Sequence, residues 1–248
     1  MPEHISRAGH RLAYNFAPGS GPGIVFLGGF KSDMNGTKAV ALEAWAKAEG
    51  RAYLRLDYSG HGISDGTFEQ GSIGHWYEDA LAVIAHATKG PQILVGSSMG
   101  GWISLLIARD HPQHVAALVT IAAAPDFTED GFWAGFTEDQ RLELFEKGRV
   151  PLPSEYGEPY IITQHLIEEG RHRLVMRDPL ALPIPIRMLQ GTADADVSTD
   201  TALRLFNHID SPDMRLTLVD GADHRFSDDA CLRLIEQSIT DVAAHLPA

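Results

Sequence analysis

Short apolar runs alternate with longer amphipathic segments along most of the chain, and this alternation limits the possible folds more than any other feature. The apolar runs predict buried strands at residues 23–30, 52–58, 92–97, 115–125, 184–191 and 214–221. The amphipathic segments predict helices at residues 37–50, 74–90, 101–112, 199–208 and 228–245. Apolar strands separated by helices are typical of a mostly parallel sheet covered by helices on both faces. We therefore predict an α/β fold, with an antiparallel hairpin at the sheet edge formed by "HRLAYNFAPG" (10–19).

Length and composition favour a single domain. The chain has 248 residues, of which 44% are hydrophobic, and this suffices for one sizeable core. The formal net charge is −13 and there is no run of Lys or Arg, which argues against a nucleic-acid or anionic-membrane partner. The one cysteine, Cys231, is expected to be a buried helical thiol. We see neither the apolar core of a signal peptide nor a run long enough to span a bilayer, so we expect a cytoplasmic protein.

Residues 126–183 interrupt the alternation of strands and helices. This interval mixes acids, prolines and aromatics, including Phe132, Trp133 and Phe136. Structureless loops of this length are rare in compact domains, so the interval should contain helices of its own. We predict a small helical lid inserted into the domain. The alternative is an ordinary helical excursion whose aromatic side chains only pack on the body of the protein.

The stretch "QILVGSSMGGW" (92–102) carries a G-x-S-x-G motif centred on Ser98. A strand precedes it and a helix follows, which is the context of a nucleophile elbow, where a sharp turn exposes the serine hydroxyl. Glycines flank the serine because the turn leaves no room for side chains there. Ser97 is the rival nucleophile, but a motif centred on it would need glycine at Val95 and Met99. We therefore predict Ser98 as the nucleophile and Ser97 as a small residue that lets the turn close.

A serine nucleophile needs a base to take its proton and an acid to orient that base. In a fold of this kind the acid and the histidine follow the serine in the chain, each in a loop after a strand. The loop after residues 184–191 contains Asp194 and Asp196, and the loop after residues 214–221 contains His224. We predict His224 as the base. Asp194 is the preferred acid because it stands nearer the strand end, whereas Asp196 is expected to cap the following helix.

The oxyanion formed by the attack needs preorganised backbone donors. One is expected to be the N–H of Met99, which follows the nucleophile. The other should come from the loop after the strand at 23–30, and the N–H of Phe30 is the preferred donor because Gly28 and Gly29 let the backbone turn there. A glycine turn without a catalytic role is the alternative for this segment.

These motifs together resemble the α/β-hydrolase superfamily over essentially the whole chain. "DYSGHGISDG" (57–66) is similar to its D-x-x-G-x-G-x-S loop, which we interpret as structural, with His61 as a loop residue. More narrowly, "MNGTKA", "LDYSGHGISDG" and "GPQILVGSSMGGW" resemble the branch of the mycophenolic acid acyl-glucuronide esterases, also described as palmitoyl-protein thioesterases. The resemblance implies a triad at Ser98, Asp194 and His224 and the hydrolysis of acyl esters and thioesters. Unlike that mitochondrial branch, this chain is expected to lack a transit peptide.

Three functions are consistent with the sequence. We favour a serine hydrolase that cleaves carboxylic esters or thioesters through an acyl-enzyme. The second is a peptidase, lactonase or carbon–carbon hydrolase on the same fold, and the third is a non-catalytic binding protein. An intact triad disfavours the third, since binding alone needs no base and acid in register. No metal site is predicted, because the pair Asp194 and Asp196 lacks the glycine and glutamate of a calcium-binding loop. No cofactor is predicted, because the proposed chemistry needs none.

The expected substrate is a small or acylated molecule. An acyl chain needs an apolar slot, for which Phe30, Phe132, Trp133 and Phe136 are the candidates. An anionic leaving group such as a glucuronide would need a local cation in this acidic protein, and Lys31 is the candidate nearest in sequence, although it could equally be a solvated surface lysine.

Overall fold

The computed structural model describes residues 2–153 and 159–246. The central sheet has eight strands in the order β1-β2-β4-β3-β5-β6-β10-β12. The strands are β1 (Glu3–Arg7), β2 (His10–Ala17), β3 (Ser20–Leu27), β4 (Arg51–Leu56), β5 (Gln92–Ser97), β6 (Val115–Ile121), β10 (Ile186–Gly191) and β12 (Met214–Val219). From β4 to β12 all neighbouring strands are parallel, whereas β1 and β2 are antiparallel additions at one edge. The mostly parallel sheet predicted from the sequence is thus confirmed.

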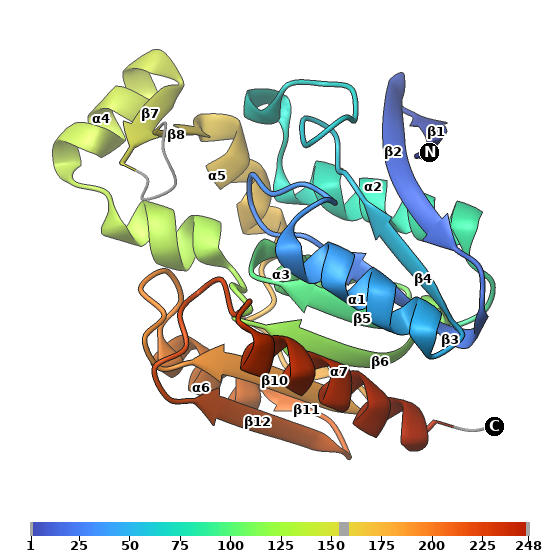
Figure 1. Cartoon of the computed structure of the whole chain (residues 1–248). Helices are drawn as coiled ribbons and strands as arrows, with labels where there is room; N and C mark the ends of the chain where they lie inside the picture. Colours follow the sequence, from blue (N-terminus) through green and yellow to red (C-terminus); the bar gives the residue numbers. More distant parts are fainter. Residues whose placement is uncertain (1, 154–158, 247–248) are drawn as a thin grey trace.

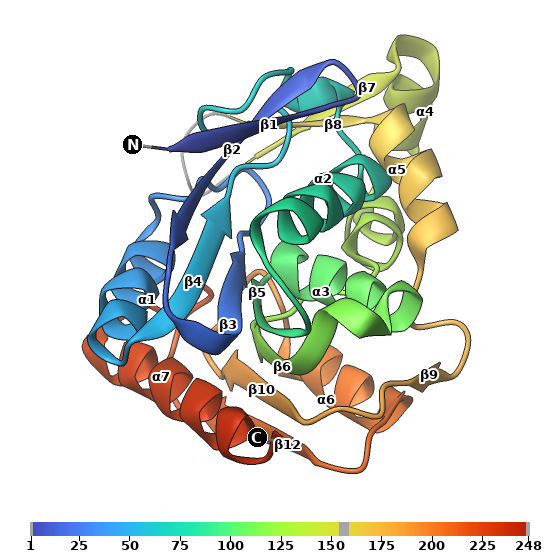
Figure 2. The ribbon, with the colours of Figure 1, turned by 90° about the vertical axis from the view of Figure 1, so that its right-hand side faces the viewer.

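Helices cover both faces of this sheet, as Figures 1 and 2 show. Helices α1 (Thr37–Ala48) and α7 (Asp229–Ala244) pack on one face, where they share a core with Phe26, Val95 and Val119. Helices α2 (Ile73–Ala87), α3 (Met99–Asp110) and α6 (Thr199–His208) pack on the other face. Adjacent residues of one strand join opposite cores because successive side chains point to opposite faces. The inner strands β3, β5, β6 and β10 are therefore buried on both sides, which explains their continuous apolar runs.

The antiparallel hairpin lies at the sheet edge, but its turn differs from the prediction. Residues 10–17 form one strand, β2, and its hairpin partner is the preceding β1, with the turn at Ala8 and Gly9. Both turn residues have positive φ, at 47° and 84°. The first strand carries the polar sequence "EHISR" and is mostly exposed, so no apolar run marks it in the sequence.

The strand predicted at 23–30 is shifted toward the N-terminus. Its sheet pairing ends at Leu27, which lies opposite Gly96, and residues 28–30 leave the sheet as a loop. The apolar run continued to Phe30 because the Phe30 ring is packed among other aromatic rings rather than paired in the sheet. The apolar run therefore indicates side-chain packing at Phe30, but not strand pairing.

The segment between β6 and β10 contains several short elements of its own. They are a π-helix (Phe127–Trp133), α4 (Glu138–Lys147), β7 (Arg149–Leu152), β8 (Tyr160–Thr163), α5 (Gln164–Gly170), a short 3₁₀ turn (Arg171–Arg173) and β9 (Leu180–Ala181), which pairs with β11 (Ile209–Asp210). Figure 1 shows α4, β7 and β8 projecting beside the body of the molecule. Residues 154–158 of the predicted lid lie outside the described residues.

Candidate active site

Three side chains from separate loops meet at the carboxyl edge of the sheet. Ser98 follows β5, Asp194 follows β10 and His224 follows β12. His224 Nε2 lies 3.1 Å from Ser98 Oγ, and His224 Nδ1 lies 2.9 Å from Asp194 Oδ2. An ionised carboxylate can only accept hydrogen bonds, so Nδ1–H donates to Asp194 and Nε2 is left to accept the Ser98 proton. The three residues predicted as a triad therefore lie in hydrogen-bonding order.

The carboxylate of Asp194 is held by four donors. Its Oδ1 accepts from the backbone N–H of Asp196 (2.9 Å) and Val197 (2.8 Å). Its Oδ2 accepts from Gln190 Nε2 (3.0 Å) as well as from His224. Burial by itself raises the pKa of Asp194, but the hydrogen bonds from His224, Val197 and Gln190 outweigh it and lower this pKa below the ordinary value. Asp194 therefore stays ionised at neutral pH.

The prediction that Asp196 caps helix α6 is wrong. The N-cap of this helix is Ser198, whose Oγ accepts a hydrogen bond from the N–H of Thr201 at 3.2 Å. Ser198 has the extended backbone that an N-cap requires, with φ −69° and ψ 152°. Asp196 lies two residues earlier in the chain, and its backbone N–H donates to Asp194.

Ser98 occupies the strained backbone conformation of a nucleophile elbow. Its φ is 53° and its ψ is −117°, which a non-glycine residue rarely adopts. Three backbone hydrogen bonds hold it there: Ser98 N–H donates to Ile121 O, and Ser98 O accepts from Gly101 and Ala124. Such strain persists only where the surroundings enforce it, and it is concentrated at functional sites.

The flanking glycines are required by close backbone contacts. A Cβ on Gly96 would lie 2.4 Å from Gly100 O, and a Cβ on Gly100 would lie 2.0 Å from Leu27 O. Because both contacts are with backbone, no side-chain rotation could relieve them. The elbow is thus pressed directly against the end of β3.

The loop of residues 28–31 lies beside the elbow. A Cβ on Gly29 would be 3.4 Å from the Cβ of Ser98, so this backbone passes close to the serine. Among the described residues, the N–H of Phe30 has no hydrogen-bond partner. Met99 is the first residue of α3, and the N–H of a first helical residue has no acceptor within its helix. Two backbone donors are therefore available near Ser98.

A cavity of about 700 Å³ opens over Ser98 and His224. One side is aromatic, and its rings are those of Phe30, Phe127, Phe132 and Tyr160. Polar and charged residues also line the cavity, and they include Ser32, Asp33, Thr37, Lys38, Arg225 and Ser227. Lys31 also lines the cavity, and its Nζ lies 5.6 Å and 5.5 Å from the ring centroids of Phe68 and Tyr160.

Trp133 and Phe136 do not fit their predicted place in the acyl slot, since neither is among the described residues that line the cavity. The Trp133 ring instead lies against the guanidinium groups of Arg141 and Arg171, at 5.0 Å and 4.7 Å from its centroid. Phe136 is buried in the hydrophobic core and contacts Trp133. Both aromatics stabilise the 126–183 segment itself.

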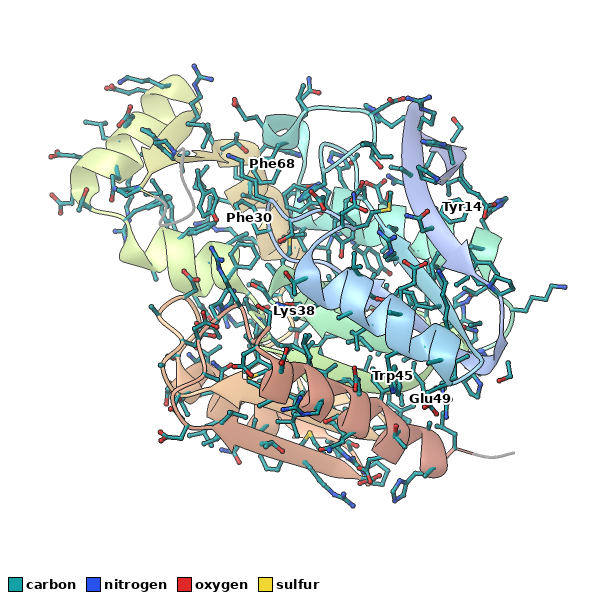
Figure 3. All side chains as sticks on the ribbon, in the orientation of Figure 1. Tyr14, Phe30, Lys38, Trp45, Glu49 and Phe68 are labelled. Carbon is teal, nitrogen blue, oxygen red and sulfur yellow. The ribbon has the colours of Figure 1, made fainter. Side chains whose placement is uncertain are left out.

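Sequence reasoning missed Lys38, which lies at the start of α1 in Figure 3. Its Nζ donates to Arg225 O, and it lines the cavity. Burial lowers the pKa of Lys38 to about 8, and nearby Asp223 offsets part of this effect. Fold topology could have found this residue, because a helix that follows a parallel strand begins at the same carboxyl edge as the active site.

One group of described residues has the side-chain spacing of a cation site. Ligand atoms of Asp194, Asp196 and His224 all lie within 4.8 Å of one another. Both oxygens of Asp194 are already used by four donors, and His224 Nδ1 is one of these. The Asp194 carboxylate is thus already engaged in hydrogen bonds within the protein.

Comparisons with known proteins agree with the fold. Residues 23–155, just over half of the chain, match the family model described as serine aminopeptidase, S33. The mitochondrial palmitoyl-protein thioesterase ABHD10 of Bos taurus is 39% identical over 236 residues, covering 93% of this chain and 76% of that protein. The structure of mouse alpha/beta hydrolase domain-containing protein 10 superimposes with a TM-score of 0.91 at 36% identity, over 99% of both chains. A putative hydrolase from Agrobacterium vitis gives a TM-score of 0.92 at 38% identity, over 98% of this chain and 97% of that one.

Fold and site together define a serine hydrolase of the ester- and thioester-cleaving class. The chain belongs to the α/β-hydrolase superfamily, and within it to the branch of the palmitoyl-protein thioesterase ABHD10. Within residues 2–153 and 159–246, no helix is long and apolar enough to cross a lipid bilayer.

Proposed function

We propose that this chain cleaves acyl esters and acyl thioesters through an acyl-enzyme on Ser98. The observation that carries the proposal is the pair of hydrogen bonds that joins Ser98 to His224 and His224 to buried Asp194. A structural serine needs neither a histidine on its hydroxyl nor a carboxylate on that histidine. This arrangement instead serves to remove the serine proton as the oxygen attacks.

In the proposed reaction, Ser98 Oγ attacks the acyl carbon while His224 Nε2 takes its proton. The oxyanion that forms accepts hydrogen bonds from the N–H groups of Phe30 and Met99. His224 then gives the proton to the leaving oxygen or sulfur, which departs as an alcohol or a thiol. Water, deprotonated by His224, attacks the acyl-enzyme in the same way and releases the carboxylic acid. The reaction uses no cofactor.

The acyl group is proposed to lie on the aromatic side of the cavity, against Phe30, Phe127, Phe132 and Tyr160. The mammalian relatives are named for thioesters of a long acyl chain. Each methylene that becomes buried in such a slot contributes up to ~0.8 kcal/mol, which corresponds to about four-fold in kcat/KM. We expect kcat/KM to rise along a series of p-nitrophenyl esters and acyl thioesters from short to medium acyl chains.

Acyl glucuronides are a second proposed substrate class, cleaved less efficiently. Their leaving group is anionic, and it must approach a protein of net charge −13. Lys31 lines the cavity, and its charge lies over the Phe68 and Tyr160 rings. Replacement by the uncharged Lys31→Met should lower glucuronide cleavage relative to p-nitrophenyl ester cleavage.

The test of the proposed reaction compares Ser98→Ala with Ser97→Ala in the p-nitrophenyl ester assay. Ser98→Ala should lower kcat/KM by about 10⁴-fold or more and abolish labelling by a fluorophosphonate. Ser97→Ala is the matched control, because it removes the neighbouring hydroxyl at the buried end of β5, and it should keep most of the activity. Circular dichroism checks that both variants fold. The reverse pattern would overturn the nucleophile assignment, and efficient peptide cleavage without any ester or thioester cleavage would overturn the substrate class.

The compartment is a separate proposal. The sequence favours the cytoplasm, whereas the names of the relatives from Bos taurus and Homo sapiens place those proteins in mitochondria. Cell fractionation with antibody detection of the native protein distinguishes the two locations.

A further inference from the structure

The loop that follows β4 contacts the loop of residues 28–31 on both sides of Phe30. Tyr58 donates its hydroxyl proton to Gly28 O at 3.2 Å. The backbone N–H of Lys31 donates to His61 Nε2, also at 3.2 Å. The two bonded backbone groups bracket the Phe30 amide, which is the proposed oxyanion donor. His61 is therefore more than the loop residue expected from the sequence.

The chemical state of His61 suits the acceptor role. Its Nδ1 lies 3.2 Å from Ser59 O, a carbonyl that can only accept, so the ring proton is on Nδ1 and the Nε2 lone pair faces Lys31. Burial lowers the pKa of His61 to about 4, although Ser59 and Asp79 oppose this shift, so the ring stays neutral at neutral pH. Tyr58 is also fully buried, and burial raises its pKa, so its hydroxyl remains a donor.

The loop that holds these residues is itself firmly attached. Asp57 accepts the N–H of Met34 on Oδ1 at 2.7 Å and the N–H of Ile63 on Oδ2 at 3.0 Å. Ser64 Oγ donates to Asp57 O and accepts from the N–H of Ala13 in β2. The indole N–H of Trp76 in α2 donates to Ser59 O. Loop 57–66 thus offers a rigid support for the neighbouring loop.

Aromatic packing restrains the Phe30 side chain from the other direction. Its ring makes edge-to-face contacts with five rings at centroid distances from 4.8 to 5.8 Å, those of Phe68, Phe127, Tyr160, Trp76 and Phe132. Figure 3 labels Phe30 and Phe68 close together, where the 126–183 segment meets the body. Lys31 needs such support, because its φ of 60° is strained for a residue with a side chain.

We propose that Tyr58 and His61 are positioning residues that hold the Phe30 amide in the geometry needed to stabilise the oxyanion. The proposal rests on the proposed function, since it assigns the supports of a donor in that reaction. A donor that is displaced by a fraction of an ångström from the oxyanion stabilises the transition state much less, while substrate binding is little changed.

The test uses Tyr58→Phe, His61→Phe and His61→Gln in the full-length protein. We expect Tyr58→Phe and His61→Phe each to lower kcat roughly 10- to 100-fold with little change in KM. The affinity for a trifluoromethyl ketone, which forms a tetrahedral adduct with the serine, should fall by a similar factor. His61→Gln should recover much of the loss, because the Gln side chain can again accept from the Lys31 N–H.

The matched control is Tyr53→Phe. Tyr53 is a buried residue of β4 whose hydroxyl donates to Ala39 O at 2.8 Å, and it belongs to the core on the sheet face opposite to the core on which Phe30 packs. It should lose stability as Tyr58→Phe does, but keep kcat and inhibitor affinity. Tyr58→Phe removes a single oxygen and decides the question even if His61→Phe does not fold. Unchanged kcat and inhibitor affinity in Tyr58→Phe, with Ser98→Ala inactive, would overturn the positioning role alone. Activity retained in Ser98→Ala would overturn the proposed function itself.

Discussion

At the scale of single residues, Asp194 combines burial with four hydrogen bonds to its carboxylate. Its side chain is fully buried, whereas that of His224 is 18% exposed. The oxygen that accepts the hydrogen bond from His224 also accepts one from Gln190, so its direction is fixed from two sides. A carboxylate held in this way sets the tautomer of the histidine and stabilises the imidazolium that forms during the reaction.

The first residue-scale prediction follows from that geometry. Asp194→Asn should lower kcat/KM by about 10³- to 10⁴-fold, because an amide nitrogen facing His224 cannot accept the Nδ1 proton and the wrong tautomer would result. Asp196→Asn is the matched control, since it makes the same change two residues away in the same turn, and it should stay near the wild-type rate. Steady-state kinetics on a p-nitrophenyl ester measures both. A larger loss of activity in Asp196→Asn than in Asp194→Asn would show that Asp196, not Asp194, is the acid that orients His224.

Much of the candidate site could be predicted at this scale, for an identifiable reason. Chain order and loop position select Ser98, Asp194 and His224, because parallel strands bring their carboxyl ends to one edge whatever the loop details. Capping by Asp196 was predicted wrongly because the start of α6 depends on the local backbone angles of Ser198. The part played by His61 depends on a contact with Lys31, thirty residues away, and no local pattern encodes it.

At the scale of elements, the elbow joins β5 to α3 with almost no free space. The Gly100 backbone lies against Leu27 at the end of β3. The end of β3 is therefore packed directly on the elbow, and we expect the position of Ser98 to depend on this contact.

A pair of glycine substitutions tests that dependence. In Gly100→Ala the new Cβ would meet backbone at 2.0 Å, so α3 must shift away from β3. We expect this variant to lose about 1–3 kcal/mol of unfolding free energy, as overpacked sites do, together with most of its activity. Gly135→Ala is the control: nothing lies within 4 Å of its new Cβ, and its stability should change little. Urea unfolding followed by tryptophan fluorescence measures both, and equal stability of the two would contradict the close packing.

The elements themselves show where sequence patterns succeed. Strand β5 and helix α6 lie where the apolar run and the helical period predict them, because β5 is buried on both faces and α6 buries one face only. The aromatics of the 126–183 segment could not be sorted in this way. Phe132 faces the cavity and Phe136 faces the core, although both occur in one short aromatic stretch. Their places depend on tertiary packing of the segment against the body.

At the scale of the whole molecule, the buried imidazole of His61 links stability to pH. Its pKa is about 4 in the folded protein and about 6.5 in an unfolded chain. The unfolded state therefore binds a proton more readily between these values, so stability falls as pH decreases from about 6.5 toward 4. At pH 5 this single group lowers the free energy of unfolding by about 2 kcal/mol relative to pH 7.5.

His61→Gln isolates this contribution. The variant has no imidazole at this position, so its unfolding free energy should decrease less than that of the wild type when the pH is lowered from 7.5 to 5. Groups such as Asp194 and Asp57 titrate in both proteins and largely cancel in the difference. Urea unfolding at the two pH values gives the comparison. Identical pH dependence in both proteins would show that His61 is protonated as easily in the folded chain as in the unfolded one.

The cavity is assembled from two parts of the chain, and this division affects how new specificities can arise. The proposed reacting groups belong to the loops of the sheet, while Phe127, Phe132 and Tyr160 come from the 126–183 segment. A segment grafted from another hydrolase could exchange the acyl preference and leave the serine, histidine and aspartate untouched. The same three rings also pack on Phe30, so a graft without aromatic groups there would loosen the loop of residues 28–31 while it changed the substrate. Substrate selectivity and reaction rate thus depend on the same side chains in this architecture. We therefore expect related proteins to change their selectivity by replacing one aromatic residue with another.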